Sequence, residues 1–337
     1  MKLVTPGRAL TMGLALLAVV VALFIVPSSE YIFLPDEAHL VGPLVSVAGE
    51  HPAKGPGGIY FVDVIVRKAT LIERLFGGLH KGADLESPDN VLPAGVTNAQ
   101  NDQLSLEEMK TSQQVAGAVA LRSLGYKVKA VGNGARVDAI EPGLPAVGKL
   151  EPTDVIVAVD GKPVTSPATL SAAMHKQAIG SLVRFTVHRE GKTKTVSINT
   201  VADPKSKRAI VGIFVEPAEA IHLPIRVSID AGNVGGPSAG LAFALDVLEK
   251  LGHNVDRGNK IAATGEIFLN GDVGPIGGIK QKTFGAREAG VDAFLVPAGQ
   301  NATDAKRYAD GLRIIPVKSF QQALHALATL PEKRSVT

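Results

Sequence analysis

The sequence predicts an α+β protein of several domains, preceded by an N-terminal transmembrane helix. An uncharged run, "ALTMGLALLAVVVALFIV", covers Ala9–Val26. Short strands separated by Gly and Pro turns fill residues 126–201, and a strand, a Gly-rich loop and an apolar helix follow from Ile221. We therefore divide the chain into residues 1–30, a membrane anchor; 31–124, an α/β region without an evident role; 125–203, a β-rich domain; and 210–332, an α+β domain.

Composition excludes several classes of protein. The 337 residues are 45% hydrophobic, which is enough for two or three domains with their own cores. Lys and Arg number 35 against 32 Asp and Glu, without a basic block, so nucleic acid is not an expected partner. Cys is absent, and the eight His include no H-E-x-x-H, so we expect no metal and no cofactor. The stretch "GLPAVGKL" fits the first part of the nucleotide-binding motif G-x-x-x-x-G-K-[ST], but Leu150 stands where the motif needs Ser or Thr. We therefore predict a turn there and no nucleotide site.

The run Ala9–Val26 predicts an uncleaved membrane anchor. About 18 helical residues extend ~27 Å, close to the hydrocarbon thickness of a bilayer. A signal peptide is the alternative, but Val26-Pro27-Ser28 is a poor cleavage site. Positive charge at Lys2 and Arg8 places the N-terminus in the cytoplasm and all that follows outside it.

Residues 125–203 resemble a PDZ domain of the bacterial periplasmic-protease kind. The matching stretches are "VDAIEPGLPA" (Val137–Ala146), "LEPTDVIVAVDGKPV" (Leu150–Val164) and "VRFTVHREGK" (Val183–Lys192), with one helix that begins after Thr165 or Ser166. The resemblance implies that an extended peptide adds to a sheet edge, with a carboxylate received near Gly132, Asn133, Gly134 and Ala135. A rigid spacer is the alternative role.

Ser238 lies where the loop "DAGNVGGPSAG" meets the apolar helix that follows it. One interpretation is a nucleophile beside the outward-pointing N–H groups of a helix N-terminus, and the other is an ordinary helix cap. "GPSAG" also satisfies the G-x-S-x-G pattern of α/β-hydrolases. That fold needs a series of βαβ units before the serine, and the β-rich domain occupies that place.

A lysine is the candidate base for Ser238. Lys280 and Lys282 lie on a helix that starts near Ile279, and two residues subtend ~200° on a helix, so they cannot share one face. Lys282 falls on the apolar stripe with Ile279 and Ala286. Burial would lower the pKa of that amine and let it accept a proton, whereas a Lys282 that snorkels to water would not.

Residues from about Ile221 to Leu330 resemble the proteolytic domain of Lon, a peptidase with a Ser/Lys dyad. The carrying motifs are "GGPSAG", "TGEIFLNGDVGPIGGIKQK" and "AGVDAFLVPAGQN", in this order. The resemblance implies that Ser238 is the nucleophile, Lys282 the base, and Thr264 a residue that hydrogen-bonds the lysine. Backbone groups around Gly236 and Ser238 would form the oxyanion hole.

The whole chain resembles bacterial, membrane-anchored Lon-like proteases that contain a PDZ domain and lack an ATPase domain. This predicts an ATP-independent serine endopeptidase outside the cytoplasm, acting on unfolded or flexible proteins, with a peptide ligand for the PDZ-like domain and an oligomeric state left open. A catalytically inactive, anchored PDZ adaptor is the alternative, although Ser238, Thr264 and Lys282 are all present.

Overall fold

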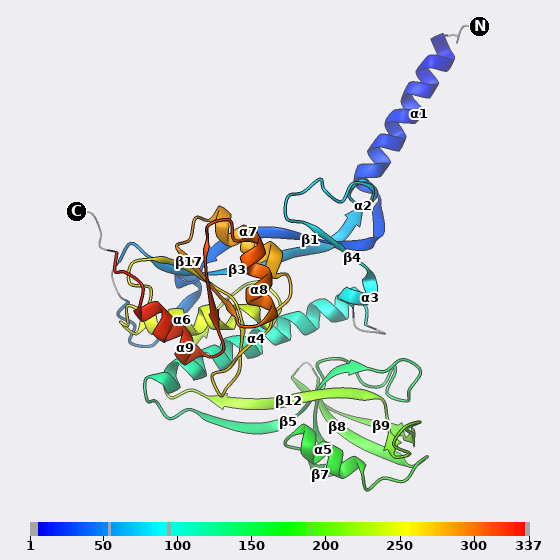
Figure 1. The fold of residues 1–337 in the computed structure, drawn as a ribbon. Coiled ribbons are helices and arrows are strands. Elements are labelled where there is room, and N and C mark those ends of the chain that lie inside the picture. Colours follow the sequence, from blue (N-terminus) through cyan, green and yellow to red (C-terminus); the bar gives the residue numbers. More distant parts are fainter. Residues whose placement is uncertain (1–5, 53–54, 93–95, 190, 334–337) are drawn as a thin grey trace.

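The structure is a computed structural model that describes residues 6–52, 55–92, 96–189 and 191–333. A body with a central sheet carries the PDZ-like domain along one side, and helix α1 (Pro6–Ile25) projects away from both (Figure 1). Among the described residues, no helix combines the length and the apolar composition needed to cross a membrane. The expected transmembrane helix is therefore not confirmed, and Lys2 lies outside the described residues.

The central sheet joins the two ends of the sequence. Its strand order is β18-β17-β14-β3-β1-β4. These strands are β1 (Pro27–Leu40), β3 (Gly58–Thr70), β4 (Asp84–Glu86), β14 (Lys260–Ala263), β17 (Ala293–Pro297) and β18 (Arg313–Val317). β1 and β3 form an antiparallel pair, whereas β14 pairs in parallel with β3 and β17. Residues 31–124, for which the sequence suggested no role, thus contribute strands to the same sheet as residues 210–332.

Helices cover both faces of this sheet. On one face lie α4 (Asn98–Ser123), α6 (Gly240–Lys250) and α9 (Phe320–Ala328), and on the other α7 (Ile279–Glu288) and α8 (Gln300–Tyr308) (Figure 1). Alternation along the strands separates the two cores: Phe61 packs with Phe243 of α6, while its neighbour Val62 packs with Ile279 and Ala286 of α7. α6 is buried from Gly240 to Glu249, which explains why its sequence is apolar apart from Asp246 and Glu249.

The PDZ-like domain is an insertion between α4 and β13. Its sheet has the order β12-β5-β6-β8-β9, with β7 beside β6. The elements are β5 (Lys129–Ile140), β6 (Val155–Val159), β7 (Lys162–Pro163), α5 (Pro167–Met174), β8 (Leu182–Arg189), β9 (Lys192–Asn199) and β12 (Ile213–His222). Ser166 caps α5, as predicted. Because β12 pairs with β5 along its whole length, the domain extends beyond residue 203.

Short elements complete the fold. They are η1 (Gly42–Leu44), β2 (Val45–Val47), α2 (Leu71–Leu75), α3 (Pro88–Val91), β10 (Val201–Ala202), β11 (Ala209–Ile210), β13 (Val227–Ile229), η2 (Pro237–Ala239), β15 (Glu266–Ile267) and β16 (Val273–Gly274). Three antiparallel pairs form among them: β2 with β13, β10 with β11 and β15 with β16. The first of these pairs ties the segment that leaves the PDZ-like domain to the N-terminal part of the body.

Gly285 sets how closely α7 can approach β1. A Cβ at Gly285 would lie 2.1 Å from the carbonyl oxygen of Asp36, whereas one at Gly117 of α4 would first meet a movable methyl of Leu223 at 3.2 Å. We expect Gly285→Ala to lower the free energy of unfolding by about 2 kcal/mol or more, because the clash is with main-chain atoms of β1, which cannot rotate away as a side chain can. Gly117→Ala should change it by less than about 1 kcal/mol, since the gain in helix propensity offsets a small repacking. Urea unfolding of both variants checks this, and equal effects would contradict it.

Candidate active site

Ser238 and Lys282 meet in space although they lie on different elements. Ser238 is the central residue of η2, which continues into α6, and Lys282 lies in the first turn of α7. The Lys282 Nζ donates to the Ser238 Oγ at 2.8 Å and to the carbonyl oxygen of Val62 at 2.7 Å. A neutral amine that keeps its N–H on Val62 can turn its lone pair toward the serine O–H. The pair thus has the geometry of a nucleophile and its base.

Burial prepares Lys282 for this role. Its side chain is buried under β3, with 4% of the residue exposed. Loss of hydration lowers the pKa of Lys282 from 10.5 to about 8, and the nearby charge of Asp63 opposes that shift. A substantial fraction of the amine is therefore neutral slightly above neutral pH.

Lys280 lies on the other face of α7. Its Nζ donates to the Asp84 carboxylate at 2.7 Å and to the carbonyl oxygen of Ala83 at 3.0 Å. These bonds hold it away from Ser238. The predicted division of the two lysines between opposite faces of the helix matches this arrangement.

The dyad opens into a cleft of about 490 Å³. Its apolar wall comes from β1 and β3, through Phe33, Val64 and Val66, and the Gly-rich loop Asn233–Gly235 forms the opposite side. Gly235 lets this loop pack closely on α4, because a Cβ at this position would lie 2.8 Å from the Ser105 Cβ.

Asp63 is a member of the site that the sequence analysis missed. It lies on β3 next to Val62, lines the same cleft, and its Oδ1 is 3.4 Å from the His39 Nε2. Burial raises the pKa of Asp63, and the neighbouring Asp36 adds to that effect. The ligand atoms of Asp36, His39 and Asp63 lie within 4.8 Å of one another, which is a spacing suited to a metal ion although the sequence predicted none. The available signal was a single carboxylate inside the apolar run "IYFVDVIV".

Thr264 supports the serine backbone and not the lysine amine. It is fully buried, and its hydroxyl donates to the main-chain oxygen of Ser238 at 3.1 Å. The N–H of Gly265 donates to the same oxygen at 2.8 Å. Among the described residues no hydrogen bond joins Thr264 to Lys282, so the expected contact is corrected to one with the Ser238 carbonyl.

Gly236 has a different role from the one expected. Its N–H donates to the carbonyl oxygen of Ser105 at 2.8 Å and is therefore not available to an oxyanion. Its φ of 80° lies in the left-handed region, which explains why a glycine is needed here. Of the groups first considered for the oxyanion hole, this leaves the N–H of Ser238.

The expected carboxylate loop of the PDZ-like domain is also corrected. Gly132, Gly134 and Ala135 lie inside β5 and pair with β12, and Asn133 sits at an irregularity of that pairing. A Cβ at Gly132 would be 2.3 Å from the carbonyl oxygen of Thr165, so this strand packs closely against the segment before α5. Within the described part of the chain, β12 pairs with β5 alone and ends the sheet order. β12 is therefore one edge strand of this sheet, and β9, which pairs with β8, is the edge strand at its other end.

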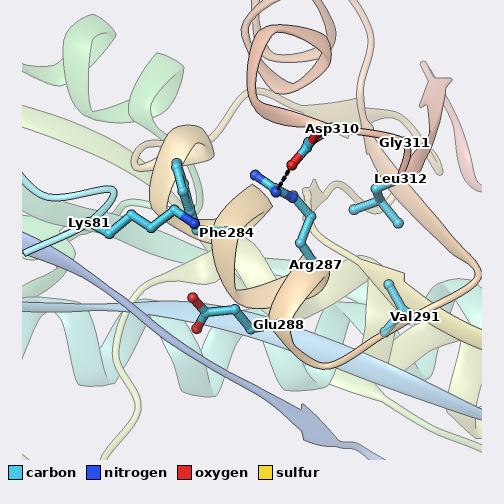
Figure 2. A pocket seen from close by; sticks show the side chains of 8 residues that line it. All are labelled: Lys81, Phe284, Arg287, Glu288, Val291, Asp310, Gly311 and Leu312. Atoms are coloured by element: carbon cyan, nitrogen blue, oxygen red, sulfur yellow. Dashed lines mark hydrogen bonds and ion pairs between the residues drawn. The ribbon is translucent and has the colours of Figure 1, made fainter.

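A second cavity, of about 380 Å³, lies beside α7, the helix that carries Lys282. Figure 2 shows Phe284, Arg287 and Glu288 of that helix lining it, with Arg287 paired to Asp310. Neither Ser238 nor Lys282 reaches it. The chemistry thus resides in the cleft beside β3.

Comparisons with known proteins match two parts of the chain to two different families. Residues 123–200 match the PDZ domain family, and residues 196–329 match the Lon protease (S16) C-terminal proteolytic domain. Lon protease 2 of Bacillus subtilis is 37% identical over 111 residues, covering 33% of this chain and 19% of that protein. Lon protease of Azorhizobium caulinodans is 38% identical over 149 residues, and the match covers 42% of this chain and 17% of that protein.

Among solved structures, the PDZ domain of the SdrC-like protein from Listeria innocua is 26% identical. The match covers 24% of this chain and 92% of the chain in that structure, with a TM-score of 0.24. The chain spans less than a fifth of the length of the Lon proteases it matches. The matches, together with the dyad, support a serine protease that carries a PDZ domain and a Lon-type proteolytic domain.

The lowered pKa of Lys282 predicts the pH dependence of catalysis. Only the neutral amine can accept the serine proton, so kcat/KM should rise about tenfold per pH unit below pH 8 and level off above it. The Lys280→Ala variant should show the same profile, because that lysine does not touch Ser238. A kcat/KM that stays constant between about pH 5 and 9 would exclude a lysine base with this pKa.

Proposed function

We propose that the chain is an ATP-independent serine endopeptidase that cleaves unfolded or flexible proteins. The observation that carries this proposal is the 2.8 Å contact between the Lys282 Nζ and the Ser238 Oγ inside an open cleft. The cleft admits an extended chain, and the described residues include no element that would unfold a compact substrate.

The dyad supports a two-step hydrolysis. The Ser238 Oγ attacks the peptide carbonyl carbon while its proton passes to the Lys282 Nζ. The C–N bond then breaks, and the leaving amine takes that proton, which leaves an acyl-enzyme. A water molecule gives a proton to Lys282, attacks the ester carbon and releases Ser238 with its proton restored. The backbone N–H of Ser238 would stabilise the oxyanion in both steps.

The PDZ-like domain would bind an extended peptide at β12. An edge strand offers unpaired backbone N–H and C=O groups, and α5 packs against both β12 and β5. The bound peptide would be a segment of the substrate or a regulatory ligand. This function does not depend on the dyad, so an inactive adaptor would keep it.

Degradation of casein, an unfolded protein, tests the peptidase proposal. We expect the protein to degrade casein without ATP, and Ser238→Ala and Lys282→Ala to reduce the rate at least about 10³-fold, as losses of paired catalytic groups do. Lys280→Ala is the matched control and should retain activity within about threefold. Circular dichroism establishes that each variant is folded. An absence of cleavage by the wild-type protein, with peptide binding intact, would favour the adaptor.

The cellular location is a separate proposal. The uncharged run Ala9–Val26 and the basic residues before it support an anchor with the remaining chain outside the cytoplasm. Protease added to intact spheroplasts should then degrade residues 31–332 of the expressed chain, while a cytoplasmic marker protein survives. Complete protection, lost only when the membrane is lysed, would contradict this location.

A further inference from the structure

Helix α4 lies between the catalytic site and the PDZ-like domain. It packs against α6 and η2 on one side and approaches β12 on the other. Figure 1 shows it running between the central sheet and the paired strands β5 and β12. The chain enters the inserted domain directly after this helix. A shift of the domain relative to the body would therefore act on α4 through this connection and through its contact with β12.

Two hydrogen bonds tie α4 to the loop before Ser238. The Ser112 Oγ donates to the carbonyl oxygen of Pro237 at 2.9 Å, and the Ser105 carbonyl accepts the N–H of Gly236 at 2.8 Å. Ser112 is buried, with 4% of the residue exposed. Because the loop is rich in glycine, it has few side-chain contacts of its own to hold it in place. These bonds fix the backbone immediately before the nucleophile.

A third contact ties α4 to the inserted domain. Arg136 of β5 donates to the Thr111 Oγ1 at 3.2 Å and to the Glu216 carboxylate of β12 at 2.7 Å. Only 12% of the arginine side chain is exposed. Glu108 of α4, Asp138 of β5 and Glu266 of β15 surround the same guanidinium. One arginine thus joins the helix to the free-edge strand at the junction of the two parts.

We propose that α4 couples the PDZ-like domain to the active site, with Ser112 as a positioning residue for Ser238 and Arg136 as the link to β12. The contacts form a continuous series from Glu216 through Arg136 and Thr111 to Ser112 and Pro237. A peptide that pairs with β12 would bind next to Glu216, at the start of this series. The inference rests on the proposed peptidase activity and specifies how that activity is regulated.

The effect on catalysis follows from the geometry. Without the Ser112 hydroxyl, the Pro237 carbonyl loses its partner and the loop gains freedom, so the Ser238 Oγ spends less time 2.8 Å from Lys282. Misplacement of a reacting group by about 1 Å can reduce a rate about 10²-fold. The apolar wall that β1 and β3 contribute to the cleft is unchanged, so KM should be affected less than kcat.

Ser112→Ala tests the positioning role, with Ser123→Ala as a matched control on the same helix. The Ser123 hydroxyl donates to Ala120 one turn away and does not contact the loop. We expect Ser112→Ala to lower kcat for an unfolded substrate about 10- to 100-fold with KM changed less than about twofold. Ser123→Ala should keep both within about twofold. Equal kcat values for the two variants would overturn the role of Ser112, while wild-type cleavage would leave the proposed function standing.

Arg136→Gln tests the link to the PDZ-like domain even if Ser112→Ala does not fold. We expect kcat to fall by about three- to tenfold, whereas Arg184→Gln, which removes an exposed arginine of the same domain, should have no effect. If both residues act through the same loop, the double variant Ser112→Ala/Arg136→Gln should lose no more than Ser112→Ala alone. Losses that multiply would show two independent effects and contradict the coupling. An Arg136→Gln variant as active as wild type would contradict it as well.

Discussion

The burial of one lysine amine determines how the catalytic part of this protein is built. Lys282 can act as a base only if it is held out of water, and lowering its pKa from 10.5 to about 8 corresponds to roughly 3 kcal/mol against the charged form. The fold supplies this by packing α7 closely on β1 and β3. Gly285 permits the close approach, and the Val62 carbonyl gives the amine a hydrogen-bond partner that is not a charge.

The same constraint explains why the N-terminal strands belong to the catalytic body. β3 provides Val62 and Asp63 beside the lysine, and β1 and β3 form one wall of the cleft. Without these strands, β14 would lose a neighbour and Lys282 would be open to solvent. The PDZ-like insertion then follows α4, the helix that contacts the loop carrying Ser238, and the chain returns from it through β13 to that same loop. The point of insertion in the sequence is therefore also close in space to the active site.

Local sequence was sufficient to predict the dyad and the faces of α7. Ser238 and Lys282 stand in specific motifs, and the spacing of Lys280 and Lys282 on a helix decides which of them is buried. The apolar run of α6 and the cap at Ser166 are equally local features. The membrane span, in contrast, was inferred from hydropathy alone and is not confirmed by the described residues.

Other features depend on contacts between distant parts of the chain. The pairing of β3 with β14 joins residues about 200 positions apart, and no local pattern specifies it. The pairing of β5 with β12 places Gly132 and Gly134 inside a sheet, so the carboxylate loop that the PDZ resemblance implied is a strand instead. Gly236 and Thr264 were assigned partners from their motifs, but Ser105 and the Ser238 backbone compete for the same groups. Motifs identified the residues, and tertiary packing decided their partners.

Direct titration of Lys282 tests the central claim. The Cε resonances of lysine, observed by NMR in protein labelled with ¹³C-lysine and assigned with a Lys282→Arg variant, report the protonation of each amine. One lysine resonance, absent from the variant spectrum, should titrate near pH 8. If that resonance instead titrates near 10.5, the ordinary value for a lysine, the Lys282 amine is charged at neutral pH, and Ser238 must be activated in another way.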